Sequence, residues 1–258
     1  MRFPFSGLHC ASFLGVVEVV AALIETRSYD PTQGIWGGYT RLAWSAQNGH
    51  EEVVKILLKL EEVNPNKPND HGRTPLSLAA SNGHEEVLKI LLGREGVNPD
   101  MPDSHGRTPL SHAASSRHKQ VLKILLGREE VSPDKPDNGG GTPLSYAASN
   151  GHEKVLKILL GREEVNPDRP DAYTRTPLLY AVLQGHEGVV KALLEREDVN
   201  PEKQNHRGQT PLSCAVQHGH EGIVKMLLRR EGVNPDRLDK YGRTPRIYAA
   251  RGGHKKVI

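Results

Sequence analysis

The chain has 258 residues and a formal net charge of +3; 36% of its residues are hydrophobic, 25% are charged and only 5% are aromatic. This apolar content is that of an ordered protein, so we do not expect global disorder, and two cysteines exclude a disulfide-rich framework. The scarcity of aromatic side chains argues against a thick globular core and favours thin layers of Ala, Val, Leu and Ile.

The first apolar stretch, residues 13–24, has about 12 residues and contains Glu18, whereas a membrane span needs about 20. A signal peptide is an alternative, because Arg2 precedes the stretch and small residues lie at 20–22. The repeat described next assigns the stretch to a helix pair instead, and no Asn-x-Ser/Thr acceptor occurs in the sequence. We therefore expect a protein of the cytoplasm or nucleus that is neither secreted nor bound to a membrane.

A period of 34 residues runs along the whole chain. Residues 72–105 and 140–173 are identical at 27 of 34 positions. The tripeptide Thr-Pro-Leu recurs with this period, at Thr74, Thr108, Thr142, Thr176 and Thr210. A column of histidines has the same period, at His50, His84, His118, His152, His186, His220 and His254. Periods of about 20–50 residues are typical of solenoids and repeat arrays.

One repeat predicts two helices and a long loop. In the repeat 72–105, Thr74 is expected to cap a first helix that has proline at its first position and ends at Gly83. Residues 84–92 predict a second helix with a broad apolar face. Residues 97–106 are rich in Asn, Pro, Asp and Gly, so they predict turns. On the second helix we expect Glu85 to pair with Lys89.

The motif Gly-Arg-Thr-Pro-Leu-Ser-x-Ala-Ala-x-x-Gly-His-Glu-x-Val-x-x-Leu-Leu resembles the ankyrin repeat, and the resemblance covers essentially the whole chain. The period is 34 instead of about 33, and the histidine that follows Thr-Pro-Leu in the family is kept only at His9. Its replacement, Ser77 in the repeat 72–105, is expected to remove a local hydrogen bond without threatening the fold. The tetratricopeptide repeat, also of 34 residues, lacks the Thr-Pro cap and this loop, so it fits less well.

The expected fold is therefore an all-α solenoid, in which helix-turn-helix units stack and long loops form β-turn fingers. We expect a single ankyrin array over 1–258, with partial units at 1–37 and 242–258. Its complete units are predicted at 38–71, 72–105, 106–139, 140–173, 174–207 and 208–241. Neither end has the polar outer face of a capping unit, so we expect a fragment, an incomplete gene model or part of a protein that once continued.

No residue set in the sequence points to catalysis, a bound metal or a cofactor. Five histidines of the column precede Glu, but the second ligand position of H-E-x-x-H holds Val or Leu, so a zinc protease is excluded. We expect each histidine to close the turn between its two helices. The glycines 139–141 lack a phosphate-binding motif and predict loop flexibility. Cys10 and Cys214 lie six repeats apart, about 50–60 Å at about 8–10 Å per layer, so both are expected to be reduced.

The distribution of charge does not favour nucleic-acid binding. Residues 242–258 contain five basic and no acidic residues, whereas the six complete units together have a net charge of −1. The positive charge thus lies in the last partial unit and not along a groove.

The resemblance to ankyrin repeats implies a concave protein-binding surface of loop tips and the free side of the first helices. Interface anchors are usually Tyr, Trp and Arg, and at these positions they concentrate after residue 172. The predicted partner-binding residues are Tyr173, Arg175, Arg207, Tyr241 and Arg243, joined by His206, Gln209, Trp36 and Tyr39. The alternative is that these are ordinary variable surface residues.

The sequence thus predicts a monomeric, non-catalytic scaffold that binds an unidentified protein partner. The alternative function is the recognition or regulatory array of a larger multidomain signalling or defence protein, as in the fungal ankyrin arrays that this chain resembles.

Two residues interrupt glycine columns of the repeat. Arg117 stands where the turn between the helices has glycine, and Thr174 stands where glycine follows the loop tip. A side chain at positive φ costs about 1–2 kcal/mol, so we expect weaker stacking around these repeats.

Overall fold

The computed structural model describes residues 11, 12, 14–25 and 36–252. Within these residues the regular structure is helical and contains no β-strand. The elements are α2 Val17–Glu25, η1 Trp36–Gly38, α3 Arg41–Asn48, α4 Glu51–Leu58, α5 Pro75–Asn82, α6 Glu85–Leu92, α7 Pro109–Ser115, α8 Lys119–Leu126, α9 Pro143–Ser149, α10 Glu153–Leu160, α11 Pro177–Leu183, α12 Glu187–Leu194, α13 Pro211–Gln217, α14 Glu221–Leu228 and α15 Pro245–Gly252.

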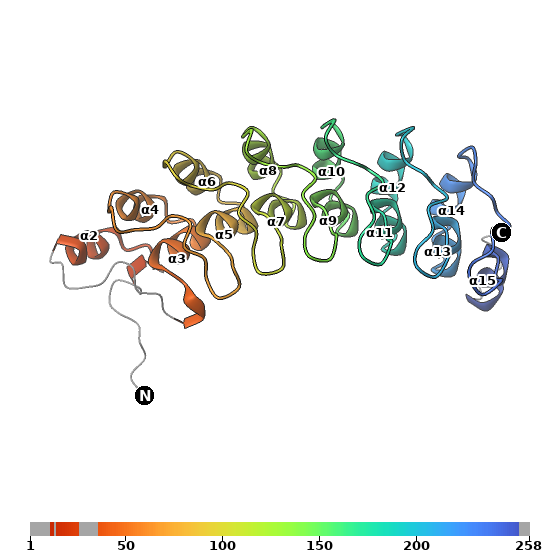
Figure 1. The fold of residues 1–258 in the computed structure, drawn as a ribbon, viewed down its shortest axis with the longest axis horizontal. Helices are drawn as coiled ribbons and strands as arrows, with labels where there is room; N and C mark the ends of the chain where they lie inside the picture. Colours follow the sequence, from red (N-terminus) through yellow and green to blue (C-terminus); the bar gives the residue numbers. More distant parts are fainter. Residues whose placement is uncertain (1–10, 13, 26–35, 253–258) are drawn as a thin grey trace. The chain divides into compact units, whose positions relative to one another are not determined.

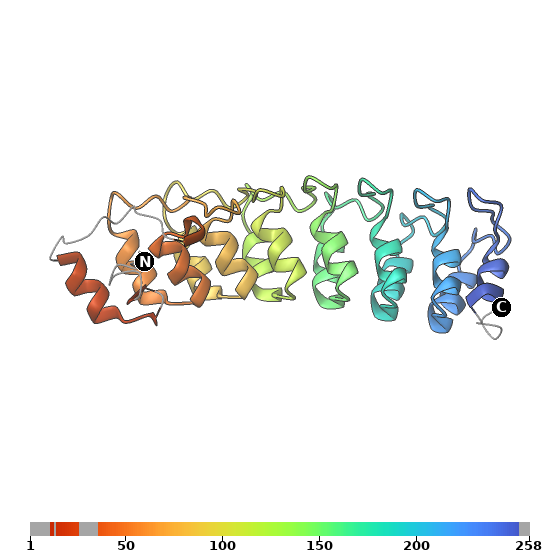
Figure 2. The ribbon, with the colours of Figure 1, turned by 90° about the horizontal axis from the view of Figure 1, so that it is seen from below.

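The chain forms two compact parts, Met1–Ser132 and Pro133–Ile258. In the N-terminal part α3, α5 and α7 pack side by side as one row, and α4, α6 and α8 form a second row (Figure 1). In the C-terminal part α9, α11, α13 and α15 form one row and α10, α12 and α14 another. Within each part the loops between helix pairs gather at the same end of the helices (Figure 2). Stacked helical repeats are therefore confirmed, while the unit boundaries stay predictions.

The first helix of each repeat begins at the threonine that the sequence predicts. The Oγ1 atom of each capping threonine accepts the backbone N–H three residues later, at 3.1–3.2 Å. These caps are Thr40, Thr74, Thr108, Thr142, Thr176 and Thr210. Except after Thr40, each capping threonine is followed by a proline in the first helical turn. Proline suits this position because the backbone N–H that it lacks would have no partner within the helix.

The expected loss of a hydrogen bond at the family's histidine position is wrong for the repeats that have serine there. Ser77 Oγ lies 3.1 Å from Thr74 Oγ1, so the serine hydroxyl supplies a bond to the cap. The serines that follow Thr108, Thr142 and Thr210 make the same contact at 3.1–3.2 Å. The cap is therefore closed by two short hydroxyl side chains.

Three histidines of the column join neighbouring helix pairs, which corrects their predicted role of closing a turn within one pair. His84 makes no capping hydrogen bond; its Nε2 lies 2.9 Å from the carbonyl oxygen of Gln47 in the preceding repeat. His118 and His186 make the equivalent contacts at 3.1 and 3.0 Å. A Cβ on Gly49 would lie 2.6 Å from His84 Nδ1, so this position needs glycine for close approach as well as for its φ of 78°.

The two interrupted glycine columns have the predicted backbone. Arg117 has φ of 67° and Thr174 has φ of 59°, the only non-glycine residues with positive φ in the part of the chain that the structure describes. Both therefore occupy the left-handed region that disfavours side chains with a Cβ.

The core consists of thin aliphatic layers, which explains the low aromatic content. First helices bury Leu and Ala, such as Leu76 and Ala80, and second helices bury Val and Leu. On the exposed side of α6, Lys89 pairs with Glu86 at 2.5 Å and not with the predicted Glu85. Such exposed pairs contribute little to stability, so the layers carry the fold.

Candidate protein-interaction surface

Each loop between helix pairs, here called a finger, ends in a five-residue tip that an acidic or amide side chain holds. In the tip 171–175, Asp171 Oδ1 accepts the backbone N–H of Tyr173 at 2.9 Å and of Arg175 at 2.8 Å. The same bonds form at the six tips among the described residues, where the accepting side chains are Asn69, Asp103, Asp137, Asp171, Asn205 and Asp239. The second and fourth residues after this side chain, where most predicted anchors lie, are thus fixed to a rigid turn.

The second carboxylate oxygen of Asp171 gathers an arginine and a tyrosine. It accepts hydrogen bonds from Arg175 Nε at 2.9 Å and from the Tyr180 hydroxyl at 2.7 Å, and it lies 2.8 Å from Arg175 Nη2. The Arg175 guanidinium carbon lies 4.9 Å from the ring centroid of Tyr173 and 4.7 Å from that of Tyr180. We call this cluster of carboxylate, arginine and helix aromatic residue an arginine clamp.

Two further tips contain an arginine clamp. At Asp239, Arg243 Nε and Nη2 lie 2.8 Å from Oδ2, the Tyr248 hydroxyl donates at 2.6 Å, and the guanidinium lies 4.6 Å over Tyr241. At Asp103, Arg107 makes the ion pair at 3.1 Å and a histidine of α7 replaces the tyrosine. In each case the clamp joins the finger tip to the first helix that follows it in the chain.

Hydrogen bonds keep the clamp carboxylates charged. Burial by itself raises the pKa of Asp239, but hydrogen bonds from Tyr248, from two backbone amides and from Arg243 outweigh it and lower the pKa below its ordinary value. Burial also raises the pKa of Asp171, but the hydrogen bonds that it accepts, first of all from Tyr180, outweigh this effect and lower the pKa below its ordinary value. Burial and the bond to Asp171 raise the pKa of Tyr180, so its phenol stays a donor.

The structure leaves the predicted anchors Tyr173 and Tyr241 open to solvent. Their exposed fractions are 60% and 68%, which are high for large apolar side chains. Tyr173 packs edge-to-face with His206 of the next finger, with ring centroids 6.2 Å apart. Arg207 is exposed and makes no ion pair with any residue that the structure describes. Four predicted residues thus present free surface on fingers of the C-terminal part.

Other predicted anchors have structural roles. Arg175 and Arg243 belong to clamps, in which the Nε and Nη2 of each lie within 2.9 Å of Asp171 or Asp239. Gln209 is only 6% exposed, and its Nε2 donates to Gln217 at 2.8 Å.

The two predicted anchors of the N-terminal part are separate from this group. Tyr39 is half-buried and stacks on Trp44, with ring centroids 4.5 Å apart and planes inclined by 27°. The side chain of Trp36 lies outside the described residues, as do Cys10, His9 and His254.

The sequence analysis missed the residues that hold the tips. Asp or Asn recurs every 34 residues at the start of each tip, with Arg four residues later and Tyr or His nine residues later in several repeats. This spacing could have revealed the clamp from the sequence, because it recurs with the same 34-residue period as the Thr-Pro motif.

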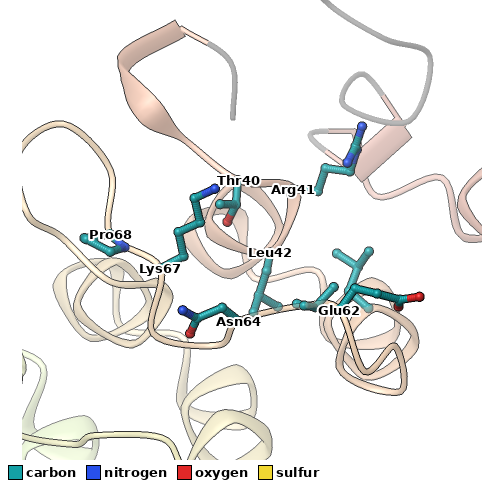
Figure 3. Close-up of a pocket in the computed structure, with 9 residues that line it drawn as sticks. Thr40, Arg41, Leu42, Glu62, Asn64, Lys67 and Pro68 are labelled. Carbon is teal, nitrogen blue, oxygen red and sulfur yellow. The ribbon is translucent and has the colours of Figure 1, made fainter. Parts of the chain in front are cut away.

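One hollow of the N-terminal part lies between α3, the end of α4 and the loop that follows. It has a volume of about 410 Å³, and Glu62, Asn64 and Lys67 line it from the loop (Figure 3). Arg41 stands here in place of the usual proline and is buried. None of the predicted anchors lines this hollow.

The described residues contain no group of three or more His, Cys, Asp or Glu side chains arranged to hold a metal ion. Burial raises the pKa of the Cys214 thiol to about 12, so it is not an activated nucleophile. Among the helices that the structure describes, none has both the length and the apolar character needed to cross a bilayer.

Comparisons with known proteins agree with this geometry. The family model for ankyrin repeats (3 copies) matches residues 42–137, 129–205 and 197–258. The crystal structure of the human ASB11 ankyrin repeat domain is similar, with a TM-score of 0.78 and 25% sequence identity, over 89% of this chain and 100% of that chain. None of the curated proteins matches the chain. Because the family model matches from residue 42 to residue 258, this chain belongs to the ankyrin-repeat family.

Proposed function

We propose that the chain is a non-catalytic scaffold that binds a partner protein through the finger tips of its C-terminal part. Ankyrin repeats are in general modules for protein–protein interaction. The observation that carries the proposal is the pair of exposed tyrosines, Tyr173 and Tyr241, each resting on a clamped arginine. A tyrosine that is already held loses little conformational freedom when a partner binds, so it makes an efficient anchor.

Within the predicted set, the contact residues are Tyr173, His206, Arg207 and Tyr241. Arg175 and Arg243 act as positioning residues, because each guanidinium is fixed on a carboxylate beneath the tyrosine that it supports. Gln209 also positions its tip, since it bonds Asn205. Trp36 and Tyr39 stay sequence-based predictions.

The partner in this proposal is a protein and not a nucleic acid, and the scaffold acts as a monomer in the cytoplasm or nucleus. The tip arginines support this choice of partner, because Asp171 and Asp239 neutralise two of those that would otherwise meet phosphates.

Site-specific photo-crosslinking tests the proposal. p-Benzoylphenylalanine is placed at Tyr173 or Tyr241 in the full chain, and, as matched controls, at the exposed Lys157 or Lys191 on second helices. After irradiation in native lysate, we expect a discrete adduct of the same protein from both tyrosine positions and none from the lysine positions.

Adducts of equal yield from all four positions, or from the lysine positions alone, would place the contact elsewhere and contradict the proposal. A Tyr173→Ala and Tyr241→Ala double variant should retain the fold, because both rings are mostly solvent-exposed, and lose at least tenfold in affinity for the captured protein.

A further inference from the structure

One finger tip of the C-terminal part lacks the arginine that completes a clamp. In the tip 137–141, Asp137 Oδ1 accepts the backbone N–H of Gly139 and of Gly141 at 2.8 Å each, so the turn is intact. The Tyr146 hydroxyl donates to Asp137 Oδ2, so the aromatic partner is also in place. The fifth residue of the tip, however, is Gly141, where the other aspartate tips have Arg107, Arg175 and Arg243. This tip and the helix after it therefore contain the carboxylate and the phenol of a clamp, but they do not contain the guanidinium.

The missing arginine leaves the carboxylate of this tip less covered than the others. Asp103, Asp171 and Asp239 are 6%, 7% and 7% exposed, whereas Asp137 is only half-buried. Gly139 also stands where the tips at 171 and 239 have an exposed tyrosine. The two glycines thus replace the arginine that pairs with the carboxylate and the tyrosine that packs on that arginine in the tips at 171 and 239.

A pocket occupies this place. It has a volume of about 160 Å³, and its wall includes Asp137, Gly141 and Tyr146 from one tip and the helix after it, and Tyr173 and Tyr180 from the next tip and the helix after that. Pockets for whole small-molecule ligands are typically about 300–1,000 Å³, so this one is suited to a single side chain. Its charged lining residues in the C-terminal part are Asp137, Asp171 and Arg175, which leaves one negative charge unbalanced.

We propose that this pocket binds the guanidinium of an arginine side chain presented by the partner protein, in the place of the missing clamp arginine. The inference rests on the proposed function, because it names the chemistry by which the finger surface recognises its partner. The neighbouring clamp is the template: there a guanidinium lies 2.8–2.9 Å from the carboxylate oxygen and 4.7 Å from the helix tyrosine centroid.

Arginine suits this site better than lysine. The planar guanidinium can bond a carboxylate through two N–H groups while its face stacks on a tyrosine ring. An ammonium group is a compact point charge that lacks this fork and this face. The three filled clamps of the same chain all use arginine, which is direct evidence of what this geometry accepts.

The test measures binding of a short arginine peptide to the full chain. Acetyl-Gly-Arg-Gly-amide is titrated into isotope-labelled protein at low salt, and the Gly139 and Gly141 amide resonances are followed because both amides bond Asp137. The same peptide with citrulline, the uncharged isostere of arginine, is the ligand control. We expect saturable shifts with the arginine peptide and at least tenfold weaker binding of the citrulline peptide.

Two variants locate the effect. Gly141→Arg fills the pocket with the residue of the other clamps and should weaken peptide binding at least tenfold, read at the Gly139 amide. Position 141 has ordinary φ, so the variant is expected to fold as the tips 103–107 and 171–175 do. Asp236→Asn removes an exposed carboxylate that does not line the pocket and should leave the affinity within twofold of wild type.

Equal binding of arginine and citrulline peptides, an unchanged affinity of Gly141→Arg, or no saturable shift at Gly139 would overturn the inference. Any of these results together with partner crosslinks at Tyr173 and Tyr241 would leave the proposed function standing. Arginine binding without those crosslinks would overturn the proposed function alone.

Discussion

At the scale of single residues, one acidic or amide side chain at the start of each described tip holds that tip in place. Asp171 accepts two backbone N–H groups, a guanidinium and a phenol, so almost all of its hydrogen-bonding capacity is used inside the protein. Charge-assisted bonds of this kind are stronger than neutral ones, which offsets the cost of burying the charge. The equivalent clamp at Asp103 differs in one residue, because His112 takes the place of tyrosine.

This difference predicts a pH dependence of stability. Burial and the nearby Arg73 lower the pKa of His112 to about 4, although Asp103 acts in the opposite direction. The unfolded chain, with an ordinary histidine pKa of about 6.5, binds more protons between about pH 4 and 6.5, so stability falls as the pH drops through this window. His112→Tyr, which installs the residue found at 146, 180 and 248, should remove a pH-dependent loss on the order of 2 kcal/mol. Urea unfolding at pH 7 and pH 4.5 measures it.

The matched control for His112→Tyr is His105→Tyr, at an exposed position of the same finger. It should retain the pH dependence of the wild type. An equal loss of stability on acidification in wild type and His112→Tyr would show that the buried imidazole does not titrate as the structure indicates.

At the scale of elements, neighbouring fingers are joined by backbone hydrogen bonds that depend on glycine. Ala172 N donates to Gly139 O at 2.8 Å and Lys240 N donates to Arg207 O at 3.1 Å. Within the described residues, the equivalent carbonyl of Tyr173 instead receives the ring Nδ1 of His206 at 3.3 Å. At the corresponding Gly208, a Cβ would lie 2.7 Å from the backbone N of Lys240. The Cβ of Thr174 therefore accounts for the lost backbone bond.

Thr174→Gly should stabilise the protein by about 1–2 kcal/mol, because it relieves the positive φ of 59° and lets the backbone bond form. The measurement is the midpoint of thermal unfolding, with hydrogen exchange at the His206 amide, whose protection should rise. Thr174→Ala keeps a Cβ and should bring no gain. Arg117→Gly relieves strain at the other such position and should also stabilise. Unchanged or lower unfolding midpoints for both glycine variants would contradict the prediction that Thr174 and Arg117 strain the backbone.

At the scale of the whole molecule, the chain is an ankyrin-repeat array with two compact parts, Met1–Ser132 and Pro133–Ile258. In such arrays stability is approximately a sum of repeat energies and nearest-neighbour interfaces, so damage to one repeat spreads mainly to adjacent ones. Within each part, the contacts between helices connect adjacent pairs, as in the rows α9 to α15 and α10 to α14.

A cavity in the C-terminal part should therefore have a local effect. Leu178 is fully buried in α11, and Leu178→Ala should cost about 2–5 kcal/mol. Hydrogen exchange should accelerate most in α9, α11 and α13 and least in α3 to α6. The reciprocal variant Leu76→Ala, in α5, should reverse this order. The same acceleration over all helices in both variants would mean that the array unfolds as one cooperative unit.

The sequence by itself determined the helices, their caps and the turns, because these depend on residues a few positions apart. Thr74 caps the third residue after it, and Gly83 ends its helix through its own backbone angle. The tertiary structure decided which side chains are free. His84 bonds a carbonyl 37 residues away, Arg175 is held by a carboxylate and two rings, and Gly141 leaves a pocket where a clamp arginine would stand. Those contacts join different elements, so they follow from how fingers and helices stack and not from local preference.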